Sequence, residues 1–193
     1  MTSDTLVFAI SQSGETADTL GALRESQRKG YRSLGICNNV ASTIARESDG
    51  GVYMHAGPEI GVAATKSFTS QVVILTLVGL LLGRMRHLST AEGTRSHRAR
   101  SKRSRKKSSN CSTMSDQIKE VAKKYVAATG MLFFGRQLNF PIALEAALKV
   151  KEITYLYAEG HPSAELKHGV IALVKPELPS VFITPDDAVF SRI

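Results

Sequence analysis

Short apolar runs alternate with longer stretches of mixed polarity over the first part of the chain. Apolar runs of strand length cover residues 6–10, 33–37 and 51–54, and stretches of helical character, residues 17–29 and about 42–47, separate them. Strands that alternate with helices in this way are typical of an α/β protein with a parallel sheet. The pattern therefore predicts a βαβαβ unit.

A longer apolar segment follows this unit. After a loop over residues 56–66, residues 67–82 are helix-like, and residues 72–82 form the longest apolar run of the chain. This run is well short of the roughly 20 apolar residues that a membrane span requires. We therefore expect a buried core helix here and no membrane partner.

A second unit begins at Asp116. Apolar residues recur there at the spacing of an amphipathic helix, at Ile118, Val121, Ala122 and Tyr125. Further along, the pattern predicts a strand, a helix, an apolar strand and another short strand, over residues 131–134, 141–155, 169–174 and 180–184. Neither half has the strands of a complete doubly wound domain, so we expect an incomplete first domain over residues 1–83 and an incomplete second one over 116–193.

The net charge of +8 comes from the segment between the two predicted domains. Residues 84–115 show little apolar periodicity, and residues 94–110 contain eight Lys or Arg and no acid: Arg95, Arg98, Arg100, Lys102, Arg103, Arg105, Lys106 and Lys107. This composition predicts a solvated, irregular linker. Such a linker would bind nucleic acid non-specifically, through the phosphate backbone. Because it has no interleaved aromatic residues for base stacking, we do not expect a nucleic-acid partner.

The two cysteines indicate the cellular compartment of the protein and argue against a cysteine-bound metal. Cys37 lies in a predicted strand and Cys111 next to the basic segment, and two residues so placed form neither a disulfide framework nor a set of metal ligands. We therefore expect a cytoplasmic protein with no metal bound by these cysteines. We also expect no other metal and no cofactor.

A hydroxyl-rich turn joins the first predicted strand to the helix after it. It contains Ser11, Gln12, Ser13, Gly14 and Thr16. The first N–H groups of a helix have no partners within the helix, and the helix dipole favours an anion there. Three hydroxyls, an amide and a flexible glycine would complete a phosphate cradle. The alternative is a serine-rich helix cap that binds nothing.

Three charged residues follow one another along the predicted helix of the second unit. Glu145, Lys149 and Glu152 are spaced by four and three, which places them on one face. A carboxylate beside an ammonium group suits proton transfer with stabilisation of an oxyanion. The alternative is an exposed ion pair of little energetic value.

A histidine near titratable neighbours adds a second candidate proton carrier. His168 follows Glu165 and Lys167 in a predicted turn. A histidine in such a setting can exchange a proton near neutral pH, although an isolated histidine is more often structural.

Four separate sequence blocks, residues 11–19, 57–66, 144–155 and 165–169, together resemble one enzyme family. This is the isomerase part of the glutamine–fructose-6-phosphate aminotransferases (isomerising), the glucosamine-6-phosphate synthases. The resemblance implies two sugar-isomerase (SIS) domains, each a flavodoxin-like or Rossmann-like αβα sandwich with a parallel sheet. It also implies fructose 6-phosphate as substrate and glucosamine 6-phosphate as product.

The resemblance assigns a ligand site to the first half of the chain. In this family the hydroxyl-rich turn holds the sugar phosphate, a role that carries over to Ser11, Gln12, Ser13 and Thr16. A loop that contacts the sugar corresponds to Val62 and Ala64, and many members have serine where this chain has Ala64.

The resemblance assigns the chemistry to the second half. Glu152 matches the carboxylate that moves a proton between C1 and C2, and Lys149 matches the lysine beside it. His168 matches the histidine that opens the sugar ring, which the family supplies across a subunit interface, so a homodimer is implied.

The resemblance does not extend to the family's glutaminase domain or to the C-terminal tail that carries a Schiff-base lysine, so we expect this chain to act without them. We therefore do not expect full activity from this chain alone. Two alternatives to an isomerase portion stay open, a sugar-phosphate-binding SIS module without turnover and an inactive gene fragment.

Overall fold

The computed structural model describes residues 4–87 and 114–185. The chain forms two compact units, Met1–Arg100 and Ser101–Ile193, and each contains a three-stranded sheet in which all the strands are parallel. The predicted α/β class with parallel sheets is therefore confirmed.

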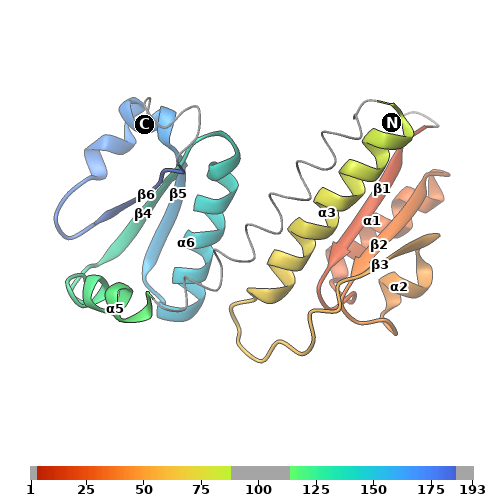
Figure 1. The fold of residues 1–193 in the computed structure, drawn as a ribbon, viewed down its shortest axis with the longest axis horizontal. Coiled ribbons are helices and arrows are strands. Elements are labelled where there is room, and N and C mark those ends of the chain that lie inside the picture. Colours follow the sequence, from red (N-terminus) through yellow and green to blue (C-terminus); the bar gives the residue numbers. More distant parts are fainter. Residues whose placement is uncertain (1–3, 88–113, 186–193) are drawn as a thin grey trace. The chain divides into compact units, whose positions relative to one another are not determined.

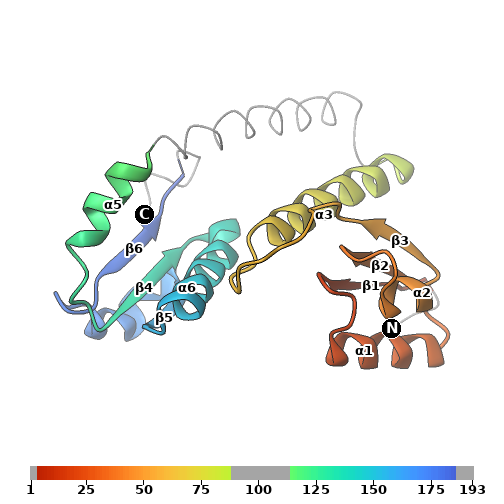
Figure 2. The same ribbon diagram turned by 90° about the horizontal axis from the view of Figure 1, so that it is seen from below.

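The first unit has the predicted βαβαβ order, with the strands in the spatial order β1-β2-β3. Its elements are β1 (Leu6–Ser11), α1 (Ala17–Arg28), β2 (Arg32–Cys37), α2 (Thr43–Glu47), β3 (Gly50–Tyr53) and α3 (Lys66–Met85). In Figure 2, α1 lies on one side of this sheet and α3 on the other. The buried core of the unit consists of Ala9, Leu23, Cys37 and Ile44, so it lies between the sheet and the helices α1 and α2.

The helix α3 differs from its prediction in both length and burial. It has 20 residues, and Ser67 is the one buried residue among them. Large apolar side chains of this helix are more than half exposed, among them Leu77 at 59% and Leu81 at 58%. The prediction of a buried core helix is therefore wrong. The apolar run indicated that the helix would gain from burial, but the described part of the first unit leaves most of its large apolar side chains exposed.

The length of α3 also changes the membrane argument. With 20 residues and a mean hydropathy of 1.7, α3 is long and apolar enough to cross a membrane, judged by length and composition alone. The 11-residue apolar run gave too short a length for the helix, because polar residues such as Lys66 and Arg84 extend it at both ends.

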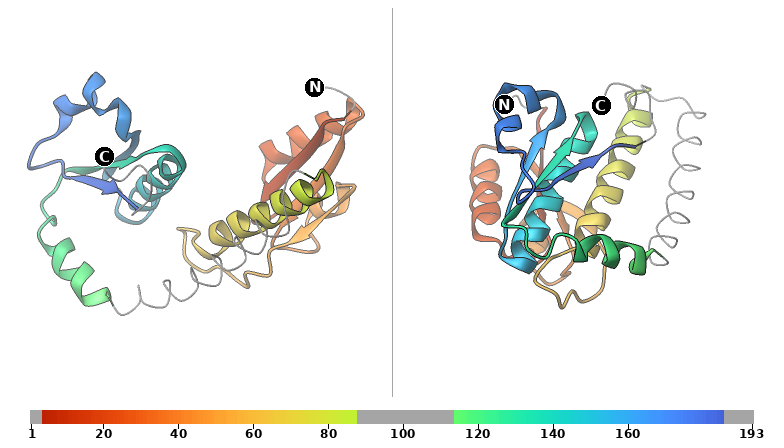
Figure 3. Two further views of the ribbon diagram at one scale, coloured as in Figure 1. Left: turned by 45° about the horizontal axis from the view of Figure 1, so that its top comes forward. Right: turned by 90° about the vertical axis from the view of Figure 1, so that its left-hand side faces the viewer.

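In the second unit the strand order is β5-β4-β6. Its elements are α5 (Ser115–Lys123), β4 (Gly130–Gly135), η1 (Gln137–Asn139), α6 (Phe140–Thr154), β5 (Tyr157–Pro162), η2 (Ser163–His168), η3 (Val170–Leu173) and β6 (Ser180–Ile183). Figures 1 and 3 show α6 along one side of this sheet and the short helices η2 and η3 on the other. Ala143 and Ala147 of α6 pack with Phe133 and Ala158, and Leu166 and Val170 pack on the opposite face.

Two strand predictions in the second unit need correction. Within the predicted strand over residues 169–174, Val170–Leu173 form the 3₁₀ helix η3, because an apolar sequence also suits a short helix that packs Val170 against the core. The strand β5 was not predicted, since it contains Glu159, Gly160 and His161 in place of an apolar run. Gly160 allows β5 to pack closely against α6, because a Cβ at this position would lie 2.8 Å from the Cα of Leu144.

The helix predicted after Asp116 is confirmed as α5, but it ends at Lys123, before Tyr125 of the predicted stripe, and the described residues leave the apolar side chains of the stripe largely exposed. Ile118, Val121 and Tyr125 are 58%, 53% and 42% exposed. The basic segment of residues 94–110 and Cys111 lie outside the described residues. The predicted boundaries 1–83, 84–115 and 116–193 stay predictions.

Candidate functional site

The hydroxyl-rich turn lies at the carboxyl end of β1 and leads into α1, as its sequence predicted. Two of its hydroxyls are joined, since the Oγ of Ser11 is 2.8 Å from the Oγ1 of Thr16. The Oγ of Ser11 also accepts the N–H of Gly14 at 3.0 Å. Thr16 precedes the first helical residue, and its side chain forms no hydrogen bond to the helix N–H groups. The start of α1 therefore keeps donors available beside two ordered hydroxyls.

Ser13 occupies the exposed part of the same turn. Its Oγ accepts the N–H of Glu15 at 3.2 Å, and the residue is exposed. A hydroxyl that accepts one hydrogen bond still has its own proton to donate. Ser13 is thus the hydroxyl of the turn that is best placed to meet a ligand from solvent.

Gly14 is required by the packing of the turn. Its φ is +69°, in the left-handed region that favours glycine, and a Cβ on it would lie 2.1 Å from the Oγ of Ser42. Its carbonyl accepts the N–H of Ile44 at 3.0 Å. The turn therefore lies directly against the start of α2, and a side chain at position 14 would separate the two.

Glu15 is the residue of the turn whose role the sequence did not reveal. Its Oε1 accepts the backbone N–H of Thr43 at 2.7 Å. This hydrogen bond is the main cause that lowers the pKa of Glu15, and Arg46 lowers it further. The negative charge is thus held against α2. No local signal marks this contact, because the partner lies 28 positions away in the sequence.

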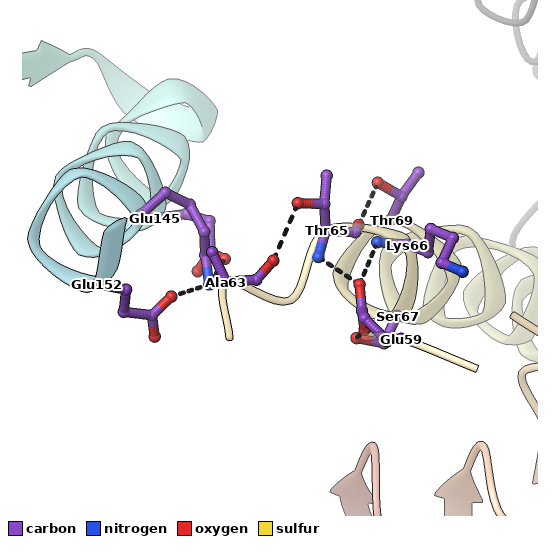
Figure 4. Close-up of polar contacts among 9 residues, drawn as sticks. Glu59, Ala63, Thr65, Lys66, Ser67, Thr69, Glu145 and Glu152 are labelled. Atoms are coloured by element: carbon purple, nitrogen blue, oxygen red, sulfur yellow. Dashed lines mark hydrogen bonds and ion pairs between the residues drawn. The ribbon is translucent and has the colours of Figure 1, made fainter. Parts of the chain in front are cut away.

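The predicted sugar-site loop is anchored where it enters α3. Figure 4 shows how the carboxylate of Glu59 accepts the N–H groups of Thr65 and Lys66, at 2.6 and 2.8 Å. It also accepts the hydroxyl of Ser67 at 2.6 Å. These hydrogen bonds, with that of Ser67 the largest cause, lower the pKa of Glu59 to about 2. The carboxylate is favoured there because it lies at the N-terminus of a long helix.

Val62 and Ala64 lie between Glu59 and this anchored end. Val62 is 86% exposed, and Ala64 is half-buried. An exposed apolar side chain on an anchored loop can contact the apolar face of a ligand. The structure therefore leaves Val62 accessible, as a ligand-contacting residue must be.

In the second unit, α6 brings the three predicted charged residues together. The Nζ of Lys149 is 2.7 Å from the Oε2 of Glu152 and 3.4 Å from the Oε1 of Glu145. The hydrogen bond to Glu152 is the main cause that raises the pKa of Lys149; burial opposes it, and Glu145 adds to the rise. The side chains of Lys149, Glu152 and Glu145 are only 22%, 28% and 23% exposed. This cluster is therefore no ordinary surface ion pair.

His168 is the last residue of η2 and is exposed. Gly169 follows it with a φ of +126°, which turns the chain away. The carboxylates of Glu145 and Glu152 on α6 pair with Lys149 and not with this histidine. The structure thus presents the imidazole of His168 to solvent.

A comparison with family models matches the SIS domain to residues 1–81 and 124–191. The chain belongs to the SIS-domain family. The match covers the hydroxyl-rich turn, the loop with Val62 and Ala64, and the cluster on α6, so each proposed functional group lies in SIS-domain sequence.

Individual relatives of this SIS-domain chain are glutamine–fructose-6-phosphate aminotransferases (isomerising). The protein of Chlorobaculum tepidum is 47% identical over 193 residues, and that of Aquifex aeolicus is 45% identical over 188 residues. These alignments include 100% and 97% of this chain but only 31% and 30% of the relatives. The chain thus spans about a third of the length of these curated relatives.

Solved structures agree with the sequence comparison. The C-terminal domain of glucosamine-fructose-6-phosphate aminotransferase from Francisella tularensis aligns with a TM-score of 0.96 at 39% identity, over 100% of this chain and 55% of that one. Glucosamine-6-phosphate deaminase from Thermotoga maritima, at 24% identity and a TM-score of 0.68, shares the fold. The SIS fold and the resemblance to the isomerase part of the aminotransferases are therefore confirmed.

Proposed function

We propose that this chain is the sugar-phosphate-binding isomerase part of an enzyme that makes glucosamine 6-phosphate from fructose 6-phosphate and glutamine. The observation that carries the proposal is the ordered hydroxyl turn at the carboxyl end of β1, since ligands of parallel α/β sheets bind at that edge. The names of the relatives support the choice of substrate.

In this proposal the turn holds the 6-phosphate group. Ser13 donates its hydroxyl proton to a phosphate oxygen, Gln12 donates from its amide, and the first N–H groups of α1 complete the cradle. Ser11 and Thr16 share one hydrogen bond, so one of their two hydroxyls keeps a proton that it donates to the anion. The joined hydroxyls of Ser11 and Thr16 already face one another at 2.8 Å. Little reorganisation is therefore needed when the anion binds.

The cluster on α6 performs the isomerisation. The carboxylate of Glu152 removes a proton from C1 of the open-chain ketose and returns it to C2, while the proton of the C1 hydroxyl passes to the oxygen on C2, so that a ketose becomes an aldose of the same composition. The ammonium group of Lys149, whose raised pKa keeps it charged at neutral pH, stabilises the negative oxygen that forms between the two steps. His168 protonates the ring oxygen when the sugar opens, and Val62 and Ala64 contact the sugar.

We also propose a cytoplasmic homodimer. His168 is exposed at the end of η2, as a residue that acts in a partner's site must be. The large apolar residues that α3 exposes supply further surface for a second copy. Size-exclusion chromatography with light scattering measures the mass in solution, and a monomer at all concentrations would contradict this part of the proposal.

Binding is tested by the thermal stability of the chain with fructose 6-phosphate. A ligand at a hundred times its Kd stabilises the native state by about 2.7 kcal/mol, so the melting temperature rises. We expect Ser13→Ala to reduce this rise without lowering the melting temperature of the free protein, because Ser13 is exposed. Thr76→Ala, which removes an exposed hydroxyl bonded within α3, is the matched control. No rise at millimolar ligand would refute the proposal.

Turnover separates the enzyme from a second candidate, a SIS module that binds sugar phosphate without chemistry. Ala64 favours this second candidate, because a methyl group offers the sugar no hydrogen bond. Conversion of fructose 6-phosphate to glucose 6-phosphate, abolished by Glu152→Gln, would establish the isomerase. Binding without any conversion would establish the module, and neither binding nor conversion would indicate an inactive gene fragment.

A further inference from the structure

Asn38 lies at the carboxyl end of β2, the middle strand of the first sheet. The proposed phosphate cradle follows β1 on one side of it, and the chain that leads to the sugar-site loop follows β3 on the other. Its backbone N–H donates to the carbonyl of Gln12 at 3.0 Å. The backbone of Asn38 is thus attached to the cradle.

The side chain of Asn38 is attached to the loop. Its Oδ1 accepts the N–H of Ala56 at 2.9 Å, and its Nδ2 donates to the carbonyl of Gly57, also at 2.9 Å. A backbone N–H can only donate and a carbonyl can only accept, so the site requires a donor and an acceptor on one short side chain. Asparagine meets this requirement, whereas alanine offers neither group.

The loop is then held at two points. Asn38 fixes the backbone of Ala56 and Gly57, and Glu59 fixes the other end at Thr65 and Lys66. Glu59 anchors the loop to its own helix, whereas Asn38 connects it to the cradle. Asn38 is therefore in a position to set the separation between the two proposed ligand-binding segments.

We propose that Asn38 is a positioning residue that sets the sugar-site loop against the phosphate cradle, and so determines how well the sugar part of a sugar phosphate is bound. The inference rests on the proposed function, in which the cradle takes the phosphate and the loop takes the sugar. It predicts that loss of the Asn38 side chain weakens the binding of a sugar phosphate much more than that of a phosphate ion, since the ion needs the cradle alone.

The test compares two probes on three forms of the full chain. Isothermal titration calorimetry measures the Kd of fructose 6-phosphate and of inorganic phosphate for the unmodified protein, Asn38→Ala and Asn39→Ala. Asn39 is the matched control, because its side chain accepts the N–H of Ala41, which belongs to neither ligand segment. We expect Asn38→Ala to raise the Kd of fructose 6-phosphate about tenfold and that of inorganic phosphate less than about twofold. Asn39→Ala leaves both values unchanged.

A second variant covers the case in which Asn38→Ala does not fold. Gly57 has a φ of +69°, and nothing lies within 4 Å of a Cβ built on it, so Gly57→Ala strains the loop from the other side without a clash. We expect this variant to show the same selective loss of affinity for fructose 6-phosphate. An equal rise in the Kd of both probes, or no rise in either Kd, would overturn the role of Asn38. An unmodified protein that binds neither probe would refute the proposed function itself.

Discussion

Gly14 shows how one residue of the proposed phosphate cradle depends on a distant part of the chain. Its left-handed φ follows from the turn, but the space beside its Cα is filled by Ser42 and Cys37. A Cβ on Gly14 would lie 2.4 Å from the Cβ of Ser42 and 3.2 Å from the Sγ of Cys37. These neighbours lie at the start of α2 and the end of β2. The cradle is thus shaped by the packing of distant segments, and Gly14 allows their close approach.

Replacement of Gly14 tests this packing. Gly14→Ala places a methyl group 2.1 Å from the Oγ of Ser42 and forces a non-glycine residue to φ +69°. We expect it to lower the free energy of unfolding by about 3 kcal/mol in urea titrations. Gly21→Ala is the control, because a Cβ there meets nothing within 4 Å, and we expect a gain of about 0.5–1 kcal/mol. Equal effects of the two variants would contradict the packing argument.

The residue types of the site were predictable where their role is local. Ser11, Ser13 and Thr16 lie between a strand and a helix, so the sequence predicts one role for their hydroxyls, the binding of a phosphate group. Glu15 and Asn38 were not assigned a role, because their partners lie 28 and about 18 positions away in the sequence. Residue types alone do not identify such pairs.

Among the elements, the entry into α3 depends on the carboxylate of Glu59. Because the pKa of Glu59 falls from 4.5 to about 2, its contribution to stability is fully present above pH 4.5 and is lost as the pH falls towards 2. We therefore expect Glu59→Gln to lower the melting temperature at neutral pH, and the difference from the unmodified protein to vanish near pH 2.

Circular dichroism melts at a series of pH values measure this difference. Glu120→Gln removes a carboxylate from an exposed ion pair with Lys123 on α5 and controls for the change in net charge. A constant difference between Glu59→Gln and the unmodified protein from neutral pH down to pH 2 would show that the hydrogen bonds of the carboxylate are unimportant.

The elements themselves were mostly predictable. The strands and helices of the first unit appear close to their predicted bounds, because alternation of apolar runs and helical spacing is a local property. The strand β5 was missed for the opposite reason. It pairs with β4 and packs against α6 through Ala158 and Gly160, so its place in the sheet depends on contacts that its own sequence does not show.

At the scale of the whole molecule, the apolar surface is larger than the sequence led us to expect. The apolar side of α3 is exposed, and α5 shows the same feature. Contiguous exposed apolar surface favours association between protein molecules. We therefore expect the chain to associate with itself in a concentration-dependent way.

Substitution of Leu77 and Leu81 tests the part of α3 in this association. They are spaced by four on one helical face and are 59% and 58% exposed. We expect the double variant Leu77→Lys and Leu81→Lys to shift the mass measured by sedimentation velocity towards the monomer. Val40→Lys, at an exposed turn position, controls for added charge. An unchanged mass would show that α3 is not an association surface.

The α/β class, the positions of most strands and helices, and the turn that forms the proposed phosphate cradle were all predictable from the order of the residues. Each of these follows from residues that lie close together in the chain, where periodicity, turn chemistry and helix termini act. The contacts of Glu15 with α2, the hydrogen bonds of Asn38 between the proposed cradle and the proposed sugar-site loop, and the exposure of α3 became visible only in the folded chain. These features depend on which surfaces meet after the chain folds, and that is set by contacts between residues far apart in the sequence.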